Sequence, residues 1–266
     1  MGLFESLKRT FNIGGCSIDI QPATSSFCQG GAVAGSVALR GGGYTQEARS
    51  LRIVLVEFWT ESRGSGKSRR TVTVTHEHAS EVLASPFSIA ADDARSLPFT
   101  LNLPIDARLA EPGKSEGWRL TVEMDIPGAV DPSGSLDLRV GPCAALLELA
   151  RLWEEVLRWR EDPAKRSWDR RERSTSFRFR PPPELAGEFD YLELACTALG
   201  GGDWQAAMSF DLQEKGFLDR LKAIIDLDKA EAGLRIPAAA LSGDLPARAA
   251  CAKELVGAMQ GIIAKR

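Results

Sequence analysis

FCQGGAVAGSVALRGGGYTQEARSLRIVLVEFWT, the stretch from Phe27 to Thr60, decides the fold of this 266-residue chain. It reads as two β-strands separated by glycines, and the second, Leu51 to Thr60, is unusually long and apolar. Apolar residues fall on one face of the first strand, Ala32 to Arg40, but on both faces of the second. Because a strand with two apolar faces needs cover on both sides, we expect Leu51 to Thr60 to be central in its domain.

Short alternating segments surround this stretch throughout residues 1–141. Further strand patterns occur at Cys16 to Gln21, Arg70 to Thr75, Leu97 to Leu103, Gly117 to Ile126 and Ser135 to Val140. The polar link Ser62 to Ser68 is typical of a hairpin tip. Because seven or eight short strands follow one another without a helix of crossover length, the sequence favours a β-sandwich over a parallel α/β sheet.

The pattern changes at Gly141-Pro142, where we place a domain boundary. Apolar residues then recur at helical spacing, which predicts a helix over residues 143–160. The second domain, residues 142–266, is again rich in strand patterns, at Ser174 to Arg180, Phe189 to Thr197, Trp204 to Leu212 and Gly233 to Leu241. Pro246 opens a terminal helix, residues 246–265. Two shorter amphipathic helices are expected, at Leu3 to Phe11 and near Phe217 to Ile225.

Composition and charge narrow the function classes. The net charge of −3 and the pI near 5.6 give no overall attraction to nucleic acid, and we expect no nucleic-acid partner. The odd number of cysteines, five in all and scattered without metal-ligand spacing, indicates reduced thiols. No apolar run reaches the roughly 18 residues of a membrane span, and the first residues lack a signal-peptide core. The expected location is therefore cytoplasmic.

The order of these parts resembles the arrestin-like sporulation-control proteins of the stage-zero M type. The likeness covers most of residues 1–243 and rests on the segments MGLFESLKRTFNIGG, FCQGGAVAGSVALR, LRIVLVEFWT, LPFTLNLP, LDLRVGP, SFRFRPPP, FDYLELAC and FDLQEKGFLDRLKA. Where the family has Pro-Gly-Glu, this chain has Gln29-Gly30-Gly31. The resemblance implies a mainly β fold of two arrestin-like β-sandwich domains in tandem, with a helix at their junction and a C-terminal helix. It also implies a regulatory or scaffolding role without catalysis.

His76 and His78 are the only histidines, and in an extended strand they point to one side. Their imidazoles could share a metal ion, with Glu81 or Asp92 as a further ligand that the sequence does not identify. The alternative is a pair of polar side chains on a solvated strand face. No Ser-His-Asp set can be assigned, and the glycine-rich segments lack the lysine of a phosphate loop. We therefore expect no catalytic residue, no bound metal and no cofactor.

Residues 158–180 carry nine Lys or Arg against four Asp or Glu, with tryptophan and phenylalanine interleaved. Such a stretch could bind phosphate groups, acidic lipid head groups or an acidic protein. The alternative is a helix end followed by a solvated linker. The interaction candidates in this stretch are Arg166, Arg170, Arg171 and Arg173.

The terminal helix carries an apolar stripe, which could dock on its own domain or on another chain. The interaction candidates on this stripe are Leu255, Met259, Ile262 and Ile263.

The leading hypothesis is a non-enzymatic, cytoplasmic regulatory or scaffold protein that contacts other proteins through sheet edges and the terminal helix, in sporulation or developmental control. The first alternative is a peripheral membrane or trafficking adaptor that uses Leu3 to Phe11 and the basic stretch. The second alternative is a metal-dependent enzyme centred on His76 and His78. The partners expected are other proteins, with membrane contact as the alternative.

Overall fold

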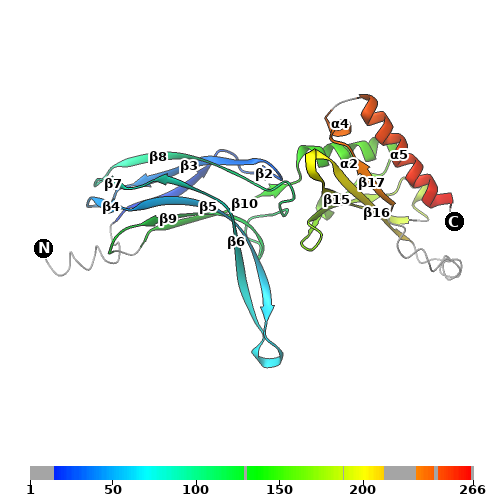
Figure 1. Ribbon diagram of the computed structural model, residues 1–266. Coiled ribbons are helices and arrows are strands. Elements are labelled where there is room, and N and C mark those ends of the chain that lie inside the picture. Colours follow the sequence, from blue (N-terminus) through cyan, green and yellow to red (C-terminus); the bar gives the residue numbers. More distant parts are fainter. Residues whose placement is uncertain (1–14, 129–130, 188, 213–231, 243–244, 265–266) are drawn as a thin grey trace. The chain divides into compact units, whose positions relative to one another are not determined.

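The computed structural model describes residues 15–128, 131–187, 189–212, 232–242 and 245–264 (Figure 1). The structure is mainly β, as predicted. The chain divides into two compact units, Met1–Gly141 and Pro142–Arg266. The helices expected at residues 3–11 and 217–225 lie outside the described residues.

The described part of the first unit consists of strands and one short 3₁₀ turn. They are β1 Ser17–Pro22, β2 Phe27–Cys28, β3 Ala32–Arg40, β4 Gln46–Ala48, β5 Ser50–Arg63, η1 Gly66–Ser68, β6 Arg70–Ala84, β7 Phe87–Ile89, β8 Ala94–Asn102, β9 Gly117–Asp125, β10 Ser133–Leu138 and β11 Val140–Gly141. A three-stranded sheet, in the order β1-β3-β8, faces a four-stranded sheet, in the order β10-β9-β5-β6. Two short pairs, β4 with β7 and β2 with β11, complete the unit.

β5 is a central strand, as its two apolar faces predicted, because it pairs with β9 on one side and β6 on the other. Its inward row, which includes Leu51, Ile53 and Leu55, is fully buried against the facing sheet. Val33 and Val37 of β3 contribute to the same core from the other side. Removal of these apolar side chains from water is the main term that holds the two sheets together.

Glycine is required at position 35, in the middle of β3, because of close packing and not because of a turn. A Cβ atom at this position would lie 2.5 Å from the backbone oxygen of Gln21 on β1 and 3.0 Å from the ring of Phe99 on β8. Glycine is the residue that allows a backbone to approach so closely, and the Gly-x-Val spacing of this strand follows from that contact.

The sandwich covers most of its own sheet edges. β1 lies beside β10 at one side, and β8 lies beside part of β6 at the other. At the second of these sides the Glu81 carboxylate accepts a hydrogen bond from the Thr100 backbone N–H, at 3.1 Å. Edge strands that lie against a neighbour cannot readily pair with another chain.

The second unit combines strands, short 3₁₀ turns and helices. They are α2 Ala144–Leu157, β12 Arg160–Glu161, η2 Pro163–Lys165, β13 Ser167–Asp169, β14 Ser174–Arg180, η3 Pro183–Leu185, β15 Phe189–Ala198, η4 Gly200–Gly202, β16 Trp204–Leu212, β17 Ala232–Ile236, α4 Ala238–Leu241 and α5 Leu245–Ala264. The strands form one sheet in the order β12-β14-β15-β16-β17, and β13 also pairs with β14.

A second β-sandwich is not confirmed, because within the described part of this unit helices occupy the place of a second sheet. The core joins Trp153 of α2 and Leu255 of α5 to Phe177, Phe179 and their neighbours on the sheet. The rings of Trp153 and Phe179 lie 6.0 Å apart, centre to centre. An apolar helix stripe can cover one face of a sheet as well as a second sheet can, so the strand pattern alone did not decide between them.

Two further boundaries differ from the prediction. β6 runs for 15 residues, to Ala84, rather than ending at Thr75. The segment from Gly233 to Leu241 is not one strand, because β17 ends at Ile236 and α4 begins after Pro237. Proline has no backbone N–H for the sheet and fits the start of a helix, which explains the change of structure at this point.

Candidate functional site

The last buried residue in the inward-facing row of β5 is a carboxylate, Glu57. Glu57 follows Leu51, Ile53 and Leu55 on the same face, yet its side chain is only 6% exposed. Its Oε1 accepts a hydrogen bond from Nε of Arg108 at 3.2 Å, and its Oε2 lies 3.2 Å from Nε2 of His78. A charge in this position requires such partners, because an unpaired buried carboxylate would be strongly destabilising.

Arg108, which is 5% exposed, links this carboxylate to the surface. Its Nη1 lies 2.5 Å from Oε2 of Glu116, whose side chain is half exposed. Its backbone oxygen accepts a hydrogen bond from the indole N–H of Trp118 at 3.0 Å. The network therefore ties together β5, β6, the start of β9 and the segment that precedes β9.

A β-bulge directs His78 into this network. Leu55 pairs with Ala79 and Val56 pairs with Glu77, so His78 is an extra residue on β6. Its ring lies 4.6 Å from the ring of Trp118 and 4.6 Å from that of His76, centre to centre. Bulges bend a strand and re-aim a side chain, and here the bend falls beside the point where β9 begins.

The metal hypothesis for His76 and His78 gains no further ligand from the described residues. His76 is exposed, as a solvated face requires, whereas His78 is only 16% exposed and faces Glu57. Glu81 bonds to Thr100, and no group of three or more His, Cys, Asp or Glu side chains in the described part of the chain could hold a metal ion. Asp92 lies in a turn with a left-handed backbone, φ 59°.

The β5–β6 hairpin extends beyond the rest of the first unit (Figure 1). β9 begins at Gly117, opposite Phe58, so from that point outward β6 is the only described strand that pairs with β5. We call residues 59–74 the arm: two paired strand ends and the turn that joins them. A two-stranded ribbon is marginally stable by itself, and the buried network at its base anchors it to the sandwich.

The two faces of the arm differ in chemistry. One face presents exposed hydroxyl groups, from Thr60, Ser62, Thr71 and Thr73. The other face presents half-buried apolar residues and charged ones, namely Trp59, Val72 and Val74 with Glu61, Arg63 and Arg70. On this second face the Trp59 indole N–H donates a hydrogen bond to Glu61 at 2.8 Å.

The outer edge of the arm is open. β6 ends the sheet order β10-β9-β5-β6, and among the described residues no strand pairs with it on the side away from β5. Every second residue of an antiparallel edge strand directs its backbone N–H and C=O outward. Since β8 lies beside another part of β6, this open edge belongs to the end of β6 that forms the arm.

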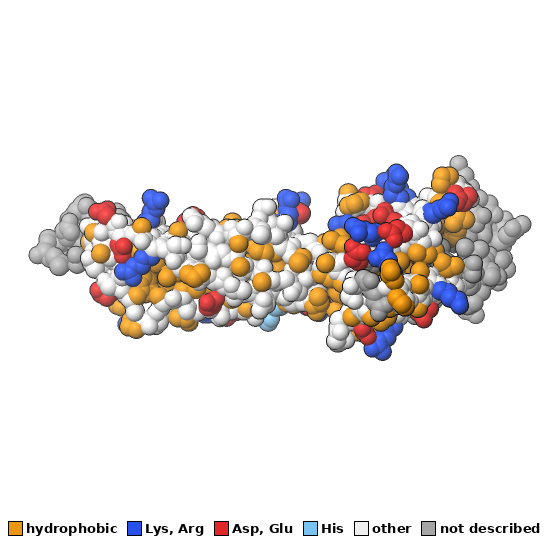
Figure 2. Space-filling model, turned by 90° about the horizontal axis from the view of Figure 1, so that it is seen from above, with side chains coloured by type: hydrophobic (Ala, Val, Ile, Leu, Met, Phe, Trp, Pro, Cys, Tyr) orange, Lys and Arg blue, Asp and Glu red, His pale blue; other side chains and the backbone are white. Residues whose placement is uncertain are grey.

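The basic stretch, residues 158–180, directs much of its charge to partners within the second unit. Arg166 forms two hydrogen bonds to Glu161, at 2.6 and 3.0 Å, and these raise the pKa of its guanidinium. Arg180 bonds to Asp162 at 2.9 Å, and Arg178 lies 3.6 Å from Glu193 and 4.0 Å from the ring centre of Tyr191. Figure 2 shows Lys and Arg side chains next to Asp and Glu on another face of the second unit, the side on which Figure 1 draws α2, α4 and α5.

The remaining candidates of this stretch lie in the turn before β14. The Arg173 guanidinium lies 5.7 Å from the ring centre of Trp168, and the Arg173 backbone is left-handed, with φ 50°. Arg170 and Arg171 are exposed. The structure therefore brings these arginines onto one turn.

The terminal helix docks on its own unit along the part whose side chains are described. Leu255 is fully buried in the core of the second unit. Arg248 forms hydrogen bonds with Glu148 and Glu155 of α2, at 3.3 and 2.8 Å. The side chains of Met259, Ile262 and Ile263 lie outside the described residues.

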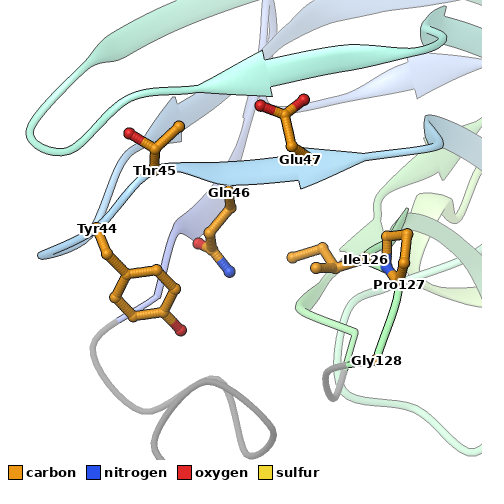
Figure 3. Close-up of a pocket in the computed structure, with 7 residues that line it drawn as sticks. All are labelled: Tyr44, Thr45, Gln46, Glu47, Ile126, Pro127 and Gly128. Carbon is orange, nitrogen blue, oxygen red and sulfur yellow. The ribbon is translucent and has the colours of Figure 1, made fainter. Parts of the chain in front are cut away.

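A small pocket opens at residues 44–47 and 126–128 of the first unit (Figure 3). Its volume is about 180 Å³, and Tyr44, Gln46 and Ile126 are among its lining residues. The Gln46 side chain already has a partner within the protein, because its Oε1 accepts a hydrogen bond from the backbone N–H of Cys16 at 2.5 Å. Ligand sites usually measure roughly 300–1,000 Å³ and gather several polar groups, so this pocket is a weak candidate.

Within the described residues, no helix combines the length and the apolar character needed to cross a bilayer.

Comparison with known proteins points to one family. The sequence profile of the family described as SpoOM protein matches residues 4–211. The sporulation-control protein spo0M of Bacillus subtilis (strain 168) is 28% identical over 133 residues, which is 50% of this chain and 49% of that relative. The match therefore spans about half the length of the curated relative.

A solved structure shows the same fold. The crystal structure of Spo0M, a sporulation control protein from Bacillus subtilis, superposes with a TM-score of 0.62 at 18% sequence identity. The superposition covers 92% of this chain and 100% of that chain.

The sequence predicted the hairpin of β5 and β6, with its tip at Ser62 to Ser68, and the structure confirms it. The sequence did not predict that this hairpin extends beyond the sandwich, or that a buried network lies at its base. Two signals were present in the sequence: Glu57 is a lone charge in an apolar strand row, and basic residues cluster around the hairpin tip. Neither identifies a site until the partners of these residues are known in three dimensions.

Proposed function

The chain belongs to the SpoOM protein family, and we propose that it is a sporulation-control regulatory protein that acts in the cytoplasm by binding another protein. We assign it no reaction of its own. The observation that carries the proposal is the open edge of β6 in the arm, where no strand of the described part of the chain pairs with the end of the sheet.

An open edge can capture an extended segment of a partner as an added strand. The backbone hydrogen bonds supply affinity, and the side chains on the two faces supply specificity. Soluble proteins usually shield such edges, and the sandwich of this chain does so beside β8 and beside β10. The contrast between a shielded body and an open arm supports the arm as the contact surface.

The membrane-adaptor alternative has weaker support. It depends on the basic stretch, where the charges of Arg166, Arg178 and Arg180 face carboxylates of the same unit. A guanidinium that already bonds to a carboxylate must give up that bond to meet a lipid phosphate, which lowers the net gain.

The proposal is tested by closing the outer edge. Neighbouring residues of β6 direct their N–H groups alternately toward β5 and away from it, so Val72→Pro and Thr73→Pro are made in parallel. The variant that keeps the wild-type melting temperature is the edge-blocking one, and the other serves as the folding control.

The two variants and the wild-type full chain are then used as baits with a lysate of the source organism, and captured proteins are quantified by mass spectrometry. We expect the edge-blocking variant to lose at least about nine tenths of a protein that the wild type captures, since a tenfold loss needs only about 1.4 kcal/mol. Equal capture by wild type and edge-blocking variant, or no capture above background, would overturn the proposal.

A further inference from the structure

We propose that the segment captured by the arm is an acidic one: an extended strand of a partner protein that places carboxylates beside Arg69 and Arg70 and apolar side chains beside Val72 and Val74. This inference rests on the proposed function, because it takes the open edge of β6 as the contact surface. It names the chemistry that the edge selects.

The first supporting observation is the charge of the arm. Residues 59–74 contain four basic residues, Arg63, Lys67, Arg69 and Arg70, and one acidic residue, Glu61, which gives a net charge of +3. The whole chain has a net charge of −3. The arm is therefore a local positive region on a protein of negative net charge, and it attracts anionic segments.

The second supporting observation is a pair of like charges. Arg63 on β5 and Arg70 on β6 occupy directly opposite positions of the ladder, on the same face of the ribbon. Like charges that face each other across two strands destabilise the pair. Glu61 lies 3.4 Å from Arg63 and compensates that side only, and a carboxylate from an added strand would compensate Arg70.

The side chains along the open edge define the rest of the ligand. Arg70, Val72 and Val74 point to one face, and Thr71 and Thr73 point to the other. A strand added beside β6 places its own alternate residues next to these two rows. The preferred segment therefore has two different faces. One face carries apolar residues at one end and carboxylates at the other end. The opposite face carries small polar residues.

An acidic protein strand fits the arm better than a membrane. A bilayer surface satisfies charge but offers no strand to pair with the outward backbone groups of β6, and the exposed hydroxyl groups of one face of the arm do not favour insertion. Vesicle binding is kept as an outcome of the test.

The experiment uses the full chain and fluorescein-labelled nine-residue peptides in which valine alternates with threonine, with glutamates in place of valines at one end. Two peptides carry the glutamates at opposite ends, because a strand can add in either direction. A third carries lysines instead. Fluorescence anisotropy measures the affinity of each, and sedimentation with vesicles containing 30% phosphatidylserine, roughly the anionic content that draws basic segments to a membrane, measures lipid binding.

We expect one glutamate peptide to bind at least about tenfold more tightly than the lysine peptide, a difference of about 1.4 kcal/mol. Arg69→Glu with Arg70→Glu weakens that binding at least about tenfold, and so does an increase in salt, because exposed charges are screened within about 10 Å at 0.1 M. The matched control is Arg40→Glu with Arg95→Glu, which makes the same charge change on the three-stranded sheet and leaves the affinity unchanged. Arg69→Gln with Arg70→Gln repeats the test without introduced repulsion.

The outcomes separate the two proposals. If the edge-blocking proline abolishes peptide binding but the arginine variants do not, the edge binds strands without selecting acidic ones, and this inference is overturned while the proposed function stands. If neither glutamate peptide binds, this inference is also overturned. It is overturned as well if vesicles bind through the arm arginines and the peptides do not bind. Loss of lysate capture with the edge-blocking variant then decides the proposed function separately.

Discussion

Two regions of this protein are rich in arginine, and they use it in opposite ways. In residues 158–180, Arg166, Arg178 and Arg180 face carboxylates or rings of the same unit. In the arm, residues 59–74, Arg63 and Arg70 lie directly opposite each other. The Glu61 carboxylate lies close to Arg63. At least three arginines of the stretch with more basic residues thus have partners in their own unit, and on this ground we propose that the arm is the more available of the two regions.

The largest test of this comparison removes an aromatic side chain from each region. Phe177→Ala deletes a fully buried ring in the core of the second unit, below Arg166, and we expect it to lower the free energy of unfolding by about 3–5 kcal/mol. Trp59→Ala in the arm deletes a half-exposed ring that makes cross-strand contacts, worth roughly 1 kcal/mol or less.

Urea unfolding followed by circular dichroism measures both variants, with separate transitions fitted for the two units where they occur. Similar losses for Phe177→Ala and Trp59→Ala would contradict the view that the basic stretch is part of a core and the arm is not.

The next test concerns the base of the arm, where the charged side chains of Glu57 and Arg108 are buried. Glu57→Ala leaves Arg108 buried with Glu116 as its remaining carboxylate, and we expect a loss of about 3 kcal/mol, the low end for breaking a buried pair. Glu116→Ala removes a half-exposed partner and costs about 1 kcal/mol or less. A larger loss for Glu116→Ala than for Glu57→Ala, measured by urea unfolding, would show that the network is not centred on Glu57.

Local pattern was sufficient to predict most strands of this protein. β3 and β14 coincide with the predicted segments, because alternation and flanking glycine or proline are properties of a few neighbouring residues. The far half of β6 was missed for the same reason. Bulges at His78 and Leu83 interrupt its alternation, so Glu77 to Ala84 shows no clean period of two.

The cover of each sheet and the partner of each charge could not be predicted in this way. The helices of the second unit were expected, but their apolar stripes do not reveal that these helices pack on the sheet in place of a second sheet. Likewise, nine basic residues in sequence do not reveal that Glu161, Asp162 and Glu193 lie close enough to pair with several of them. Both are properties of contacts between residues far apart in the chain.

A smaller effect distinguishes one arginine of each region. Arg166→Gln removes two charged hydrogen bonds to Glu161 at a partly buried site, and we expect a loss of about 1 kcal/mol after allowance for solvent exposure. Arg70→Gln removes a like-charge contact, so stability stays unchanged or rises by a few tenths of a kcal/mol, roughly. Thermal unfolding of the two single variants measures the difference, and a destabilising Arg70→Gln would argue that Arg70 has an internal partner.

The smallest effect is a dependence of stability on pH that we expect in the basic stretch. The Arg180 guanidinium bonds to the Asp162 carboxylate and holds its pKa below the ordinary value. Because the folded state binds this proton more weakly than the unfolded state, the pair contributes stability above pH about 4, near the unfolded pKa, and the contribution disappears as the pH falls through the folded pKa. Asp162→Asn should therefore be less stable than wild type at pH 6, and the two proteins should converge as the pH falls through the folded pKa. Urea unfolding of both proteins across this range measures the convergence. A difference that persists unchanged at the lowest pH would mean that Asp162 stabilises the fold by its shape and hydrogen bonds, without its charge, and that the arginines of this stretch are more available than their distances indicate.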